Sequence, residues 1–259
     1  MLVQHRPAST KGHETRMKLI AAQISATPGD VEKNLAQHID AIHAAASQGA
    51  DAVVFPELSL TGYEPELAGA LAMAPTDSRL DAFQALSDRY TLLIAVGAPT
   101  QGREGTQISM IAFQPGLPRA VYSKQLLHAD ELPFFTPGTQ QQVFRQGGHV
   151  LVPAICYESL QPAHASQAAA AGAQVYLASV AKSQKGVDLA CNHYPAMARK
   201  HGMTVIMANC VGPADNFIGA GQSAVWNPNG ERVCTADATR QALVAYDTRT
   251  GEAGTVSLA

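Results

Sequence analysis

The chain has 259 residues, a length that fits one large α/β domain or two small ones. Apolar residues make up 46% of the chain and charged residues only 15%, a composition that excludes a disordered chain. The net charge of -3 gives no electrostatic reason to expect nucleic acid or an anionic membrane surface as a partner. No apolar run approaches the roughly 18 residues needed to cross a bilayer, so we expect a soluble protein without a membrane partner.

The N-terminal segment differs from the rest of the chain. Its first 16 residues are polar and lack the apolar stretch of a secretory signal. Met17 directly precedes the first strand-like run. We therefore expect residues 1–16 to be an extension, either disordered or added ahead of the natural start, and residues 17–259 to form a single domain.

From residue 19 onward, short β-rich runs alternate with longer helical ones. Thr27–Asp30 is a turn in which Asp30 can cap a helix, and apolar residues three or four positions apart predict this helix over Val31–Ala46. Further helices are predicted at Arg79–Tyr90, Pro162–Ala171 and Val187–His201, the last kinked at Pro195 or starting there. The predicted strands are Leu19–Ile24, Ala52–Leu58, Leu92–Val96, Ser109–Gln114, Ala120–Ser123, Val150–Ile155, Val175–Ser179, Val205–Asn209, Ser223–Trp226 and Ala242–Tyr246.

This alternation predicts an α/β fold, with a mixed sheet and helices packed on its outer faces. No glycine- or serine-rich linker divides the chain, which favours one domain. The two halves follow a similar plan, although no sequence repeat proves an internal duplication.

The cysteines and histidines predict neither a metal site nor a disulfide framework. The four cysteines lie in the second half without CxxC pairing, and the nine histidines show no HxH or HxxxH spacing. Free thiols suit a reducing compartment, so we expect a cytoplasmic protein that needs no metal or other cofactor.

Three reactive side chains each follow an apolar strand: Glu57, Lys124 and Cys156. In open α/β sheets, functional groups collect at strand ends, so these residues can meet although they are far apart in the sequence. A cysteine needs a base or a cation for activation, a carboxylate can be that base, and an ammonium can stabilise an oxyanion. Taken one at a time, each residue also has a plain structural interpretation: a buried thiol, a helix cap or surface carboxylate, and a solvated lysine.

The segments around these residues resemble those of the nitrilase superfamily of carbon–nitrogen hydrolases. Phe55–Tyr63 is similar to the segment with the family's glutamate, Ala154–Glu158 to the segment with its nucleophile, and Tyr122–Lys124, with Glu131 and Phe135–Gly138, to the lysine segment. The closing segments of the family resemble Ala208–Asn209 with Gly212, Gly219–Ser223 and Asn227–Gly230. The three main segments come in the family's order, and the likeness extends from about Met17 to Asp247.

The resemblance implies a four-layer α-β-β-α sandwich that pairs into a homodimer or a higher homo-oligomer. It also implies a role for each matching residue. Glu57 is the general base, Cys156 the nucleophile and Lys124 the oxyanion stabiliser. Glu131 helps to position the substrate or the lysine, unless it is an ordinary loop carboxylate, and the backbone N–H of Tyr157 is a second oxyanion donor.

The sequence defines the substrate less closely than it defines the catalytic residues. Many family members that act on carboxylate-bearing amides have an arginine shortly after the Cys-Tyr pair, and residues 158–162 contain none. Lys182 or Lys185 can supply the missing charge, because both follow the strand Val175–Ser179, although lysines in loops are usually solvated. We expect Lys182, with Tyr63 and Tyr157, to contact substrate, and both tyrosines also fit ordinary packing.

These features predict a thiol hydrolase that cleaves a small amide-like substrate through a thioester on the cysteine. A nitrilase or an N-acyltransferase using the same residues remains an alternative. The membrane-bound acyltransferase branch is disfavoured by the lack of a spanning segment, and a glutamine-fed synthetase by the lack of an attached synthetase domain. A non-catalytic scaffold and a redox sensor based on Cys156 also stay open.

Overall fold

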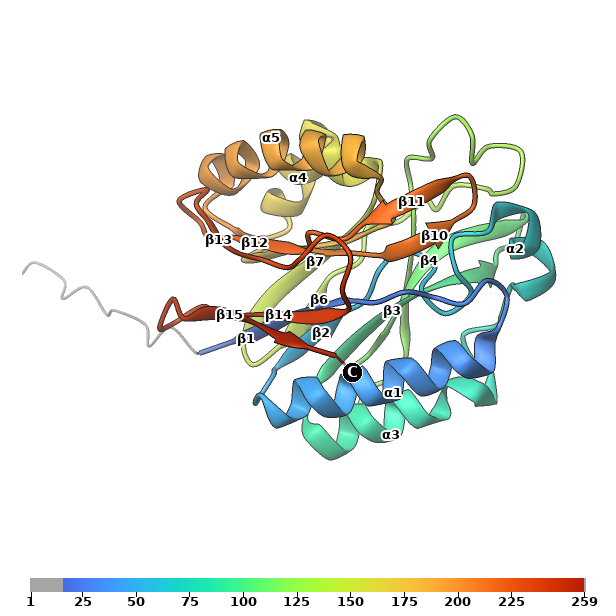
Figure 1. Ribbon diagram of the computed structural model, residues 1–259, viewed down its shortest axis with the longest axis horizontal. Helices are drawn as coiled ribbons and strands as arrows, with labels where there is room; N and C mark the ends of the chain where they lie inside the picture. The colour runs from blue at the N-terminus through green and yellow to red at the C-terminus, as the bar shows by residue number, and fades with distance from the viewer. Residues whose placement is uncertain (1–15, 259) are drawn as a thin grey trace, which may run out of the picture.

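The computed structural model describes residues 16–258 and contains two large β-sheets packed face to face. Helices cover the outer face of each sheet, so that the molecule has four layers, as Figure 1 shows. The predicted α-β-β-α sandwich is confirmed. The predicted extension at residues 1–16 lies outside the described residues except for Arg16, whose guanidinium pairs with Asp247 at 2.7 Å.

The first sheet has seven strands in the order β15-β14-β1-β2-β3-β4-β5. Strands β1, β2 and β3 run parallel to one another, and the remaining pairs are antiparallel. The bounds are Lys18–Gln23 (β1), Ala52–Val54 (β2), Leu93–Gln101 (β3), Thr106–Phe113 (β4), Ala120–Ser123 (β5), Ala242–Asp247 (β14) and Ala253–Ser257 (β15).

The second sheet has six strands in the order β13-β12-β9-β8-β7-β6, with β7, β8 and β9 parallel. A separate two-stranded ribbon, β10-β11, extends from the same region. The bounds are Phe144–Gln146 (β6), His149–Ile155 (β7), Val175–Val180 (β8), Thr204–Asn209 (β9), Val211–Ala214 (β10), Phe217–Ala220 (β11), Ala224–Trp226 (β12) and Arg232–Thr235 (β13).

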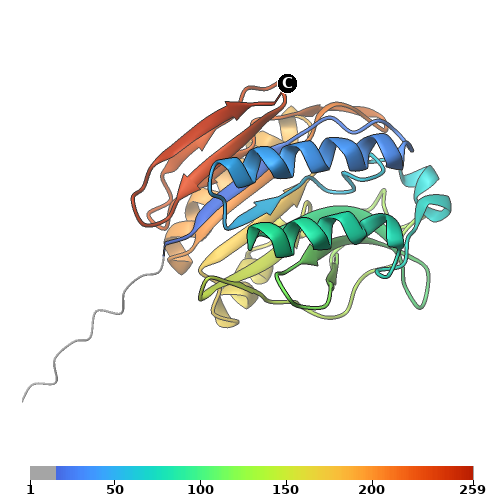
Figure 2. The ribbon, with the colours of Figure 1, turned by 90° about the horizontal axis from the view of Figure 1, so that it is seen from below.

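The helices divide between the two outer faces. Figure 2 shows α1 (Val31–Ser47) and α3 (Asp81–Tyr90) side by side on the first sheet, while α4 (Pro162–Ala170) and α5 (Gln184–His201) cover the second. The short α2 (Pro65–Leu71) and the 3-10 turns η1 (Ser78–Leu80) and η2 (Glu158–Leu160) complete the helical elements. None of the helices described by the structure is long and apolar enough to span a bilayer.

Side-chain alternation along the strands builds three apolar layers. In β1, Leu19 and Ala21 face the second sheet, whereas Ile20 and Ala22 face the helices α1 and α3. The layer between the sheets unites apolar residues of both, and a third layer lies under α4 and α5. Both faces of each sheet are therefore buried, which explains why the central strands read as continuous apolar runs.

Several predicted bounds were wrong. The strand predicted at Ala52–Leu58 ends at Val54, because the chain turns through residues 55–62. The helix predicted at Arg79–Tyr90 starts with the 3-10 turn η1, so its α-helical part begins at Asp81. The last helix begins at Gln184 and continues through Pro195, which is therefore not its start.

Candidate active site

Glu57 lies in the turn that follows β2, pressed against strand β3. At Gly97 of β3, an added Cβ would lie 2.3 Å from Pro56 O and 2.5 Å from the backbone nitrogen of Leu58. The turn can approach this closely only because Gly97 has no side chain. Leu58 itself adopts a left-handed conformation with φ 52°. This packing leaves Glu57 only 2% exposed, at the end of the first sheet.

Replacing Gly97 with Ala tests whether this close approach positions Glu57. We expect turnover to fall at least tenfold and the free energy of unfolding to drop by about 1–3 kcal/mol, because the new methyl group must push the turn away. The control is Gly254→Ala in β15, where an added Cβ meets nothing within 4 Å. Steady-state kinetics and urea denaturation measure both effects. Equal turnover and an equal free energy of unfolding in the two variants would show that the turn adjusts to the added methyl group, so that Gly97 does not position Glu57.

Lys124 follows β5 and forms the centre of a buried charge cluster. Its Nζ donates to Glu57 Oε1 at 2.8 Å and to Glu131 Oε1 at 2.6 Å. Its side chain is fully buried. The backbone is fixed on both sides, since Lys124 N donates to Ile108 O at 2.8 Å and Gly138 N donates to Lys124 O at 2.7 Å. One ammonium therefore serves two carboxylates inside the protein.

The two carboxylates differ in their remaining contacts. Glu131 also accepts hydrogen bonds from the Tyr63 hydroxyl at 2.9 Å and from His128 N at 2.8 Å. Glu57 Oε2, by contrast, is buried without a hydrogen-bond partner within residues 16–258. A buried carboxylate oxygen without a partner is costly and is free to accept a proton. Of the pair, Glu57 is therefore the one with the vacant acceptor.

Cys156 lies at the turn between β7 and η2. Its φ is 46°, a left-handed conformation that non-glycine residues adopt rarely and that often marks a functional site. The backbone is anchored to the neighbouring strand, because Cys156 N donates to Ser179 O at 3.0 Å. The Sγ atom lies 3.7 Å from Ala181 O and 3.6 Å from Lys182 Nζ.

Glu158 connects the segment of the lysine to the segment of the cysteine. Its Oε1 accepts from Ile155 N at 2.8 Å and from the Tyr122 hydroxyl at 2.6 Å. Its Oε2 accepts from Gln125 N at 2.7 Å and from Leu126 N at 3.2 Å. The fully buried carboxylate therefore holds the residues next to both reactive side chains. Sequence reasoning assigned it no role; the available signal was a carboxylate two residues after the cysteine.

Burial and mutual charge set the pKa values of the cluster. Burial raises the pKa of Glu57; the charge of Lys124 opposes this shift and that of Glu131 adds to it. Burial would lower the pKa of Lys124, but the charges of Glu57, Cys156 and Glu131 raise it overall. Burial also raises the pKa of the Cys156 thiol to about 11, Glu57 acts in the same direction, and Lys182 and Lys124 oppose it. The resting cysteine is therefore a neutral thiol at neutral pH, which needs a base for attack.

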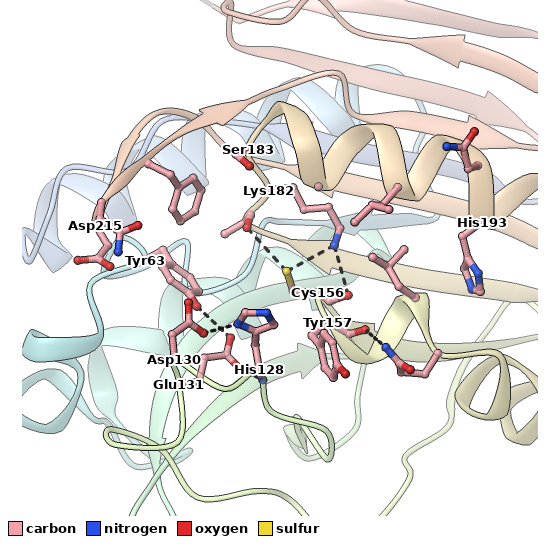
Figure 3. Close-up of a pocket in the computed structure, with 18 residues that line it drawn as sticks. Tyr63, His128, Asp130, Glu131, Cys156, Tyr157, Lys182, Ser183, His193 and Asp215 are labelled. Carbon is pink, nitrogen blue, oxygen red and sulfur yellow. Dashed lines mark hydrogen bonds and ion pairs between the residues drawn. The ribbon is translucent and has the colours of Figure 1, made fainter.

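A pocket of about 770 Å³ opens onto the sulfur, as Figure 3 shows. Five of the predicted site residues line it: Tyr63, Glu131, Cys156, Tyr157 and Lys182. Glu57 and Lys124 do not line this pocket and are buried. Lys124 links Glu57 to the pocket residue Glu131, because it donates to both carboxylates. Lys185 is exposed on α5 and does not line it either. Of the two lysines that the sequence offered for this charge, Lys182 lines the pocket and Lys185 does not.

The two pocket tyrosines have different surroundings. Tyr63 stacks edge-on against Phe217, with ring centroids 5.6 Å apart, and donates to Glu131. Tyr157 is 38% exposed and packs against His128 at 5.3 Å. Its backbone N–H has no hydrogen-bond acceptor in the part of the chain that the structure describes. Residues 16–258 contain no group of three or more His, Cys, Asp or Glu side chains placed to hold a metal ion.

Comparison with known proteins identifies the family. Residues 18–255 match the family model described as carbon-nitrogen hydrolase. The chain belongs to the carbon-nitrogen hydrolase family. It is therefore an enzyme that acts on carbon–nitrogen bonds, as the resemblance of its segments predicted.

Two similar proteins illustrate the range of the family, one of them through two structures. A cysteine-to-alanine variant of the amidase from Nesterenkonia sp. AN1, in complex with butyramide, has a TM-score of 0.81 and 28% identity, covering 90% of this chain and 91% of that one. Another variant of that amidase, with the acetamide moiety of fluoroacetamide added covalently to the active-site cysteine, has a TM-score of 0.82 and 26% identity, covering 91% and 92%. The glutamine-dependent NAD(+) synthetase of Acinetobacter baylyi is 27% identical over 87% of this chain and 43% of its own length. The chain thus spans less than half of this curated relative.

Proposed function

We propose that this protein is an amidase that hydrolyses a small amide through a thioester on Cys156. The observation that carries the proposal is the placement of a pocket-lining thiol next to a buried Glu57–Lys124–Glu131 cluster in which Glu57 Oε2 is unpaired. A nucleophile, a vacant base and a fixed ammonium are the parts that acyl transfer from an amide requires.

In the first half of the reaction, Glu57 takes the proton of Cys156 while the sulfur attacks the amide carbon. Lys124 uses two of its three N–H donors on the carboxylates, which leaves the third for the developing oxyanion. The free N–H of Tyr157 is the second donor. The tetrahedral intermediate then collapses, the carbon–nitrogen bond breaks, and Glu57 delivers its proton to the departing amine.

The second half removes the acyl group. Water attacks the thioester carbon while Glu57 takes a proton from it, and the carbon–sulfur bond breaks to release the carboxylic acid and regenerate the thiol. Glu131 positions Lys124 and Tyr63 throughout, since it contacts both. No step uses a metal or a cofactor.

The similarity to the Nesterenkonia amidase supports this chemistry, because that protein binds butyramide and is modified covalently at its cysteine. The match to a glutamine-dependent NAD(+) synthetase favours a second candidate, in which the amide is glutamine and the ammonia passes to another reaction. Both candidates share the thioester and differ in the acyl group.

Ammonia release across small aliphatic amides, ω-amides, glutamine, carbamoyl compounds and nitriles tests the proposal, with Cys156→Ala as the control. We expect ammonia from the parent with at least one amide and none from the variant. Nitrile turnover without amide turnover would overturn the amidase assignment in favour of a nitrilase. Acyl transfer to added hydroxylamine, with little free acid, would favour an acyltransferase.

We also propose that residues 17–259 form a single domain and that the protein works in the cytoplasm as a homodimer. All four cysteines are free thiols, which suits a reducing compartment. Leu189 of α5 is 52% exposed on the outer helical layer, where the family resemblance places the dimer contact. Light scattering coupled to gel filtration measures the mass, and we expect that of two chains; a monomer at micromolar concentration contradicts the dimer.

A further inference from the structure

A lysine that lines the pocket carries a charge that the proposed chemistry does not use. Lys182 is 5% exposed, and its Nζ lies 3.6 Å from Cys156 Sγ and 3.5 Å from Cys156 O. Figure 3 shows the ammonium beside the sulfur, with Asp130 and Asp215 on the Tyr63 side of the pocket. No Asp or Glu side chain among residues 16–258 forms an ion pair with it. The other buried lysine, Lys124, already has two carboxylate partners.

The backbone of Lys182 is held in place by buried hydrogen bonds. Lys182 N donates to Asn209 Oδ1 at 2.7 Å, and Lys182 O accepts from Asn209 Nδ2 at 3.1 Å and from Ala220 N at 2.9 Å. Asn209 is itself fully buried at the end of β9. The main chain at Lys182 therefore has little freedom to move the side chain out of the pocket.

The aliphatic part of Lys182 is positioned by a glycine. A Cβ added to Gly186, in the first turn of α5, would lie 3.0 Å from Lys182 Cβ and 3.2 Å from its Cγ. The aliphatic chain of Lys182 thus packs directly on the backbone of α5, which directs the ammonium toward Cys156. Such pre-positioning lowers the entropy cost of binding an anion.

The resting enzyme offers this ammonium no counterion. The neighbouring thiol is neutral at neutral pH, because burial raises the pKa of Cys156 to about 11. A poorly hydrated cation without a partner is unfavourable, and an anion brought by the ligand relieves that cost. The positive charge of Lys182 therefore stays uncompensated until an anionic group enters the pocket.

We propose that Lys182 binds a carboxylate of the substrate, so that the enzyme selects short amides with a carboxylate near the scissile bond. This inference rests on the proposed reaction at Cys156. The 3.6 Å between Nζ and Sγ, together with a hydrogen bond of about 2.8 Å, keeps the carboxylate oxygen within about 6.4 Å of the sulfur. With the reacting carbon about 3–3.5 Å from the sulfur, this reach suits one to three carbons between the amide and the carboxylate.

Binding to an inactive enzyme tests the selection separately from turnover. Butyramide and succinamate share a four-carbon chain and differ in a terminal methyl or carboxylate group. Isothermal titration of Cys156→Ala should show succinamate binding 10- to 100-fold tighter than butyramide, the range of a charge-assisted hydrogen bond. This preference should vanish in Cys156→Ala/Lys182→Met and persist in Cys156→Ala/Lys200→Met, which removes an exposed lysine from the far end of α5. Equal affinities for both amides in Cys156→Ala would overturn the inference.

Turnover by the enzyme with an intact Cys156 separates the remaining outcomes. Lys182→Met should raise the KM for succinamate 10- to 100-fold and should lower kcat/KM for succinamate far more than kcat/KM for butyramide. A matched loss of kcat for both amides would overturn the inference and assign Lys182 to the oxyanion. Gly186→Ala keeps the charge of Lys182 but displaces its aliphatic chain, so it should weaken the binding of succinamate more than that of butyramide. If succinamate binds selectively but no amide releases ammonia, the carboxylate site stands and the proposed hydrolysis fails.

Discussion

Replacement of Lys124 with Met is expected to lower the free energy of unfolding by about 3–5 kcal/mol and to lower kcat at least 100-fold. The stability loss follows because Glu57 and Glu131 would remain buried without the ammonium that both contact at 2.6–2.8 Å. The activity loss follows because the proposed oxyanion donor disappears. Urea denaturation and steady-state kinetics measure the two effects on the same preparation.

A double variant separates the two roles of Lys124. Adding Glu131→Gln to Lys124→Met removes one of the two unpaired carboxylates, so part of the stability should return while kcat stays low. Recovery of kcat together with stability would show that Lys124 acts only through folding. An unchanged urea midpoint of unfolding in the Lys124→Met variant would contradict the buried ion cluster itself.

Replacement of Glu57 with Gln is expected to lower kcat by about 100- to 10,000-fold, the usual contribution of a positioned general base. The amide is isosteric and can still accept from Lys124, so the fold should survive. Glu131→Gln is the matched control, because it changes the other carboxylate on the same ammonium. A larger loss of kcat from Glu131→Gln than from Glu57→Gln would assign the general base to Glu131 instead of Glu57.

The pH dependence of kcat/KM gives an independent test of Glu57. A base acts only when it is ionised, so activity is present above its pKa and is lost as the pH falls through it. Burial raises that pKa above the ordinary glutamate value of 4.5, which predicts an acid limb centred above pH 4.5. A profile that stays flat down to pH 4.5 would contradict a buried glutamate base.

The central strands were predictable because their physical signal is local. Both faces of the sheets are covered, so β1, β7, β8 and β9 appear as apolar runs, and their positions were close to the structure. The strand predicted at Leu92–Val96 was too short, because β3 continues to Gln101. The short β6, β10, β11, β13 and β15 and the helix α2 were missed, since edge strands of three to five residues and a seven-residue helix carry little periodicity. Pro195 was misleading because tertiary packing holds α5 helical on both sides of it.

The candidate site shows where sequence reasoning ends. The order of the matching segments suggested which side chains could meet. The contacts among Glu57, Lys124 and Glu131, however, depend on how the loops of the first sheet fold over the second sheet. Nothing in the sequence separated Lys182 from Lys185, since both follow the same strand and only the backbone bonds to Asn209 and the packing on Gly186 decide between them. Long-range packing of this kind has no signature in a single sequence.

Mass spectrometry of the enzyme quenched during turnover tests the central claim most directly. The parent should gain the mass of the substrate's acyl group, peptide mapping should place it on Cys156, and hydroxylamine should remove it as expected for a thioester. Cys156→Ala should show neither the adduct nor turnover. Turnover by the Cys156→Ala variant, or an acyl group mapped to another residue, would contradict the assignment of Cys156 as the nucleophile.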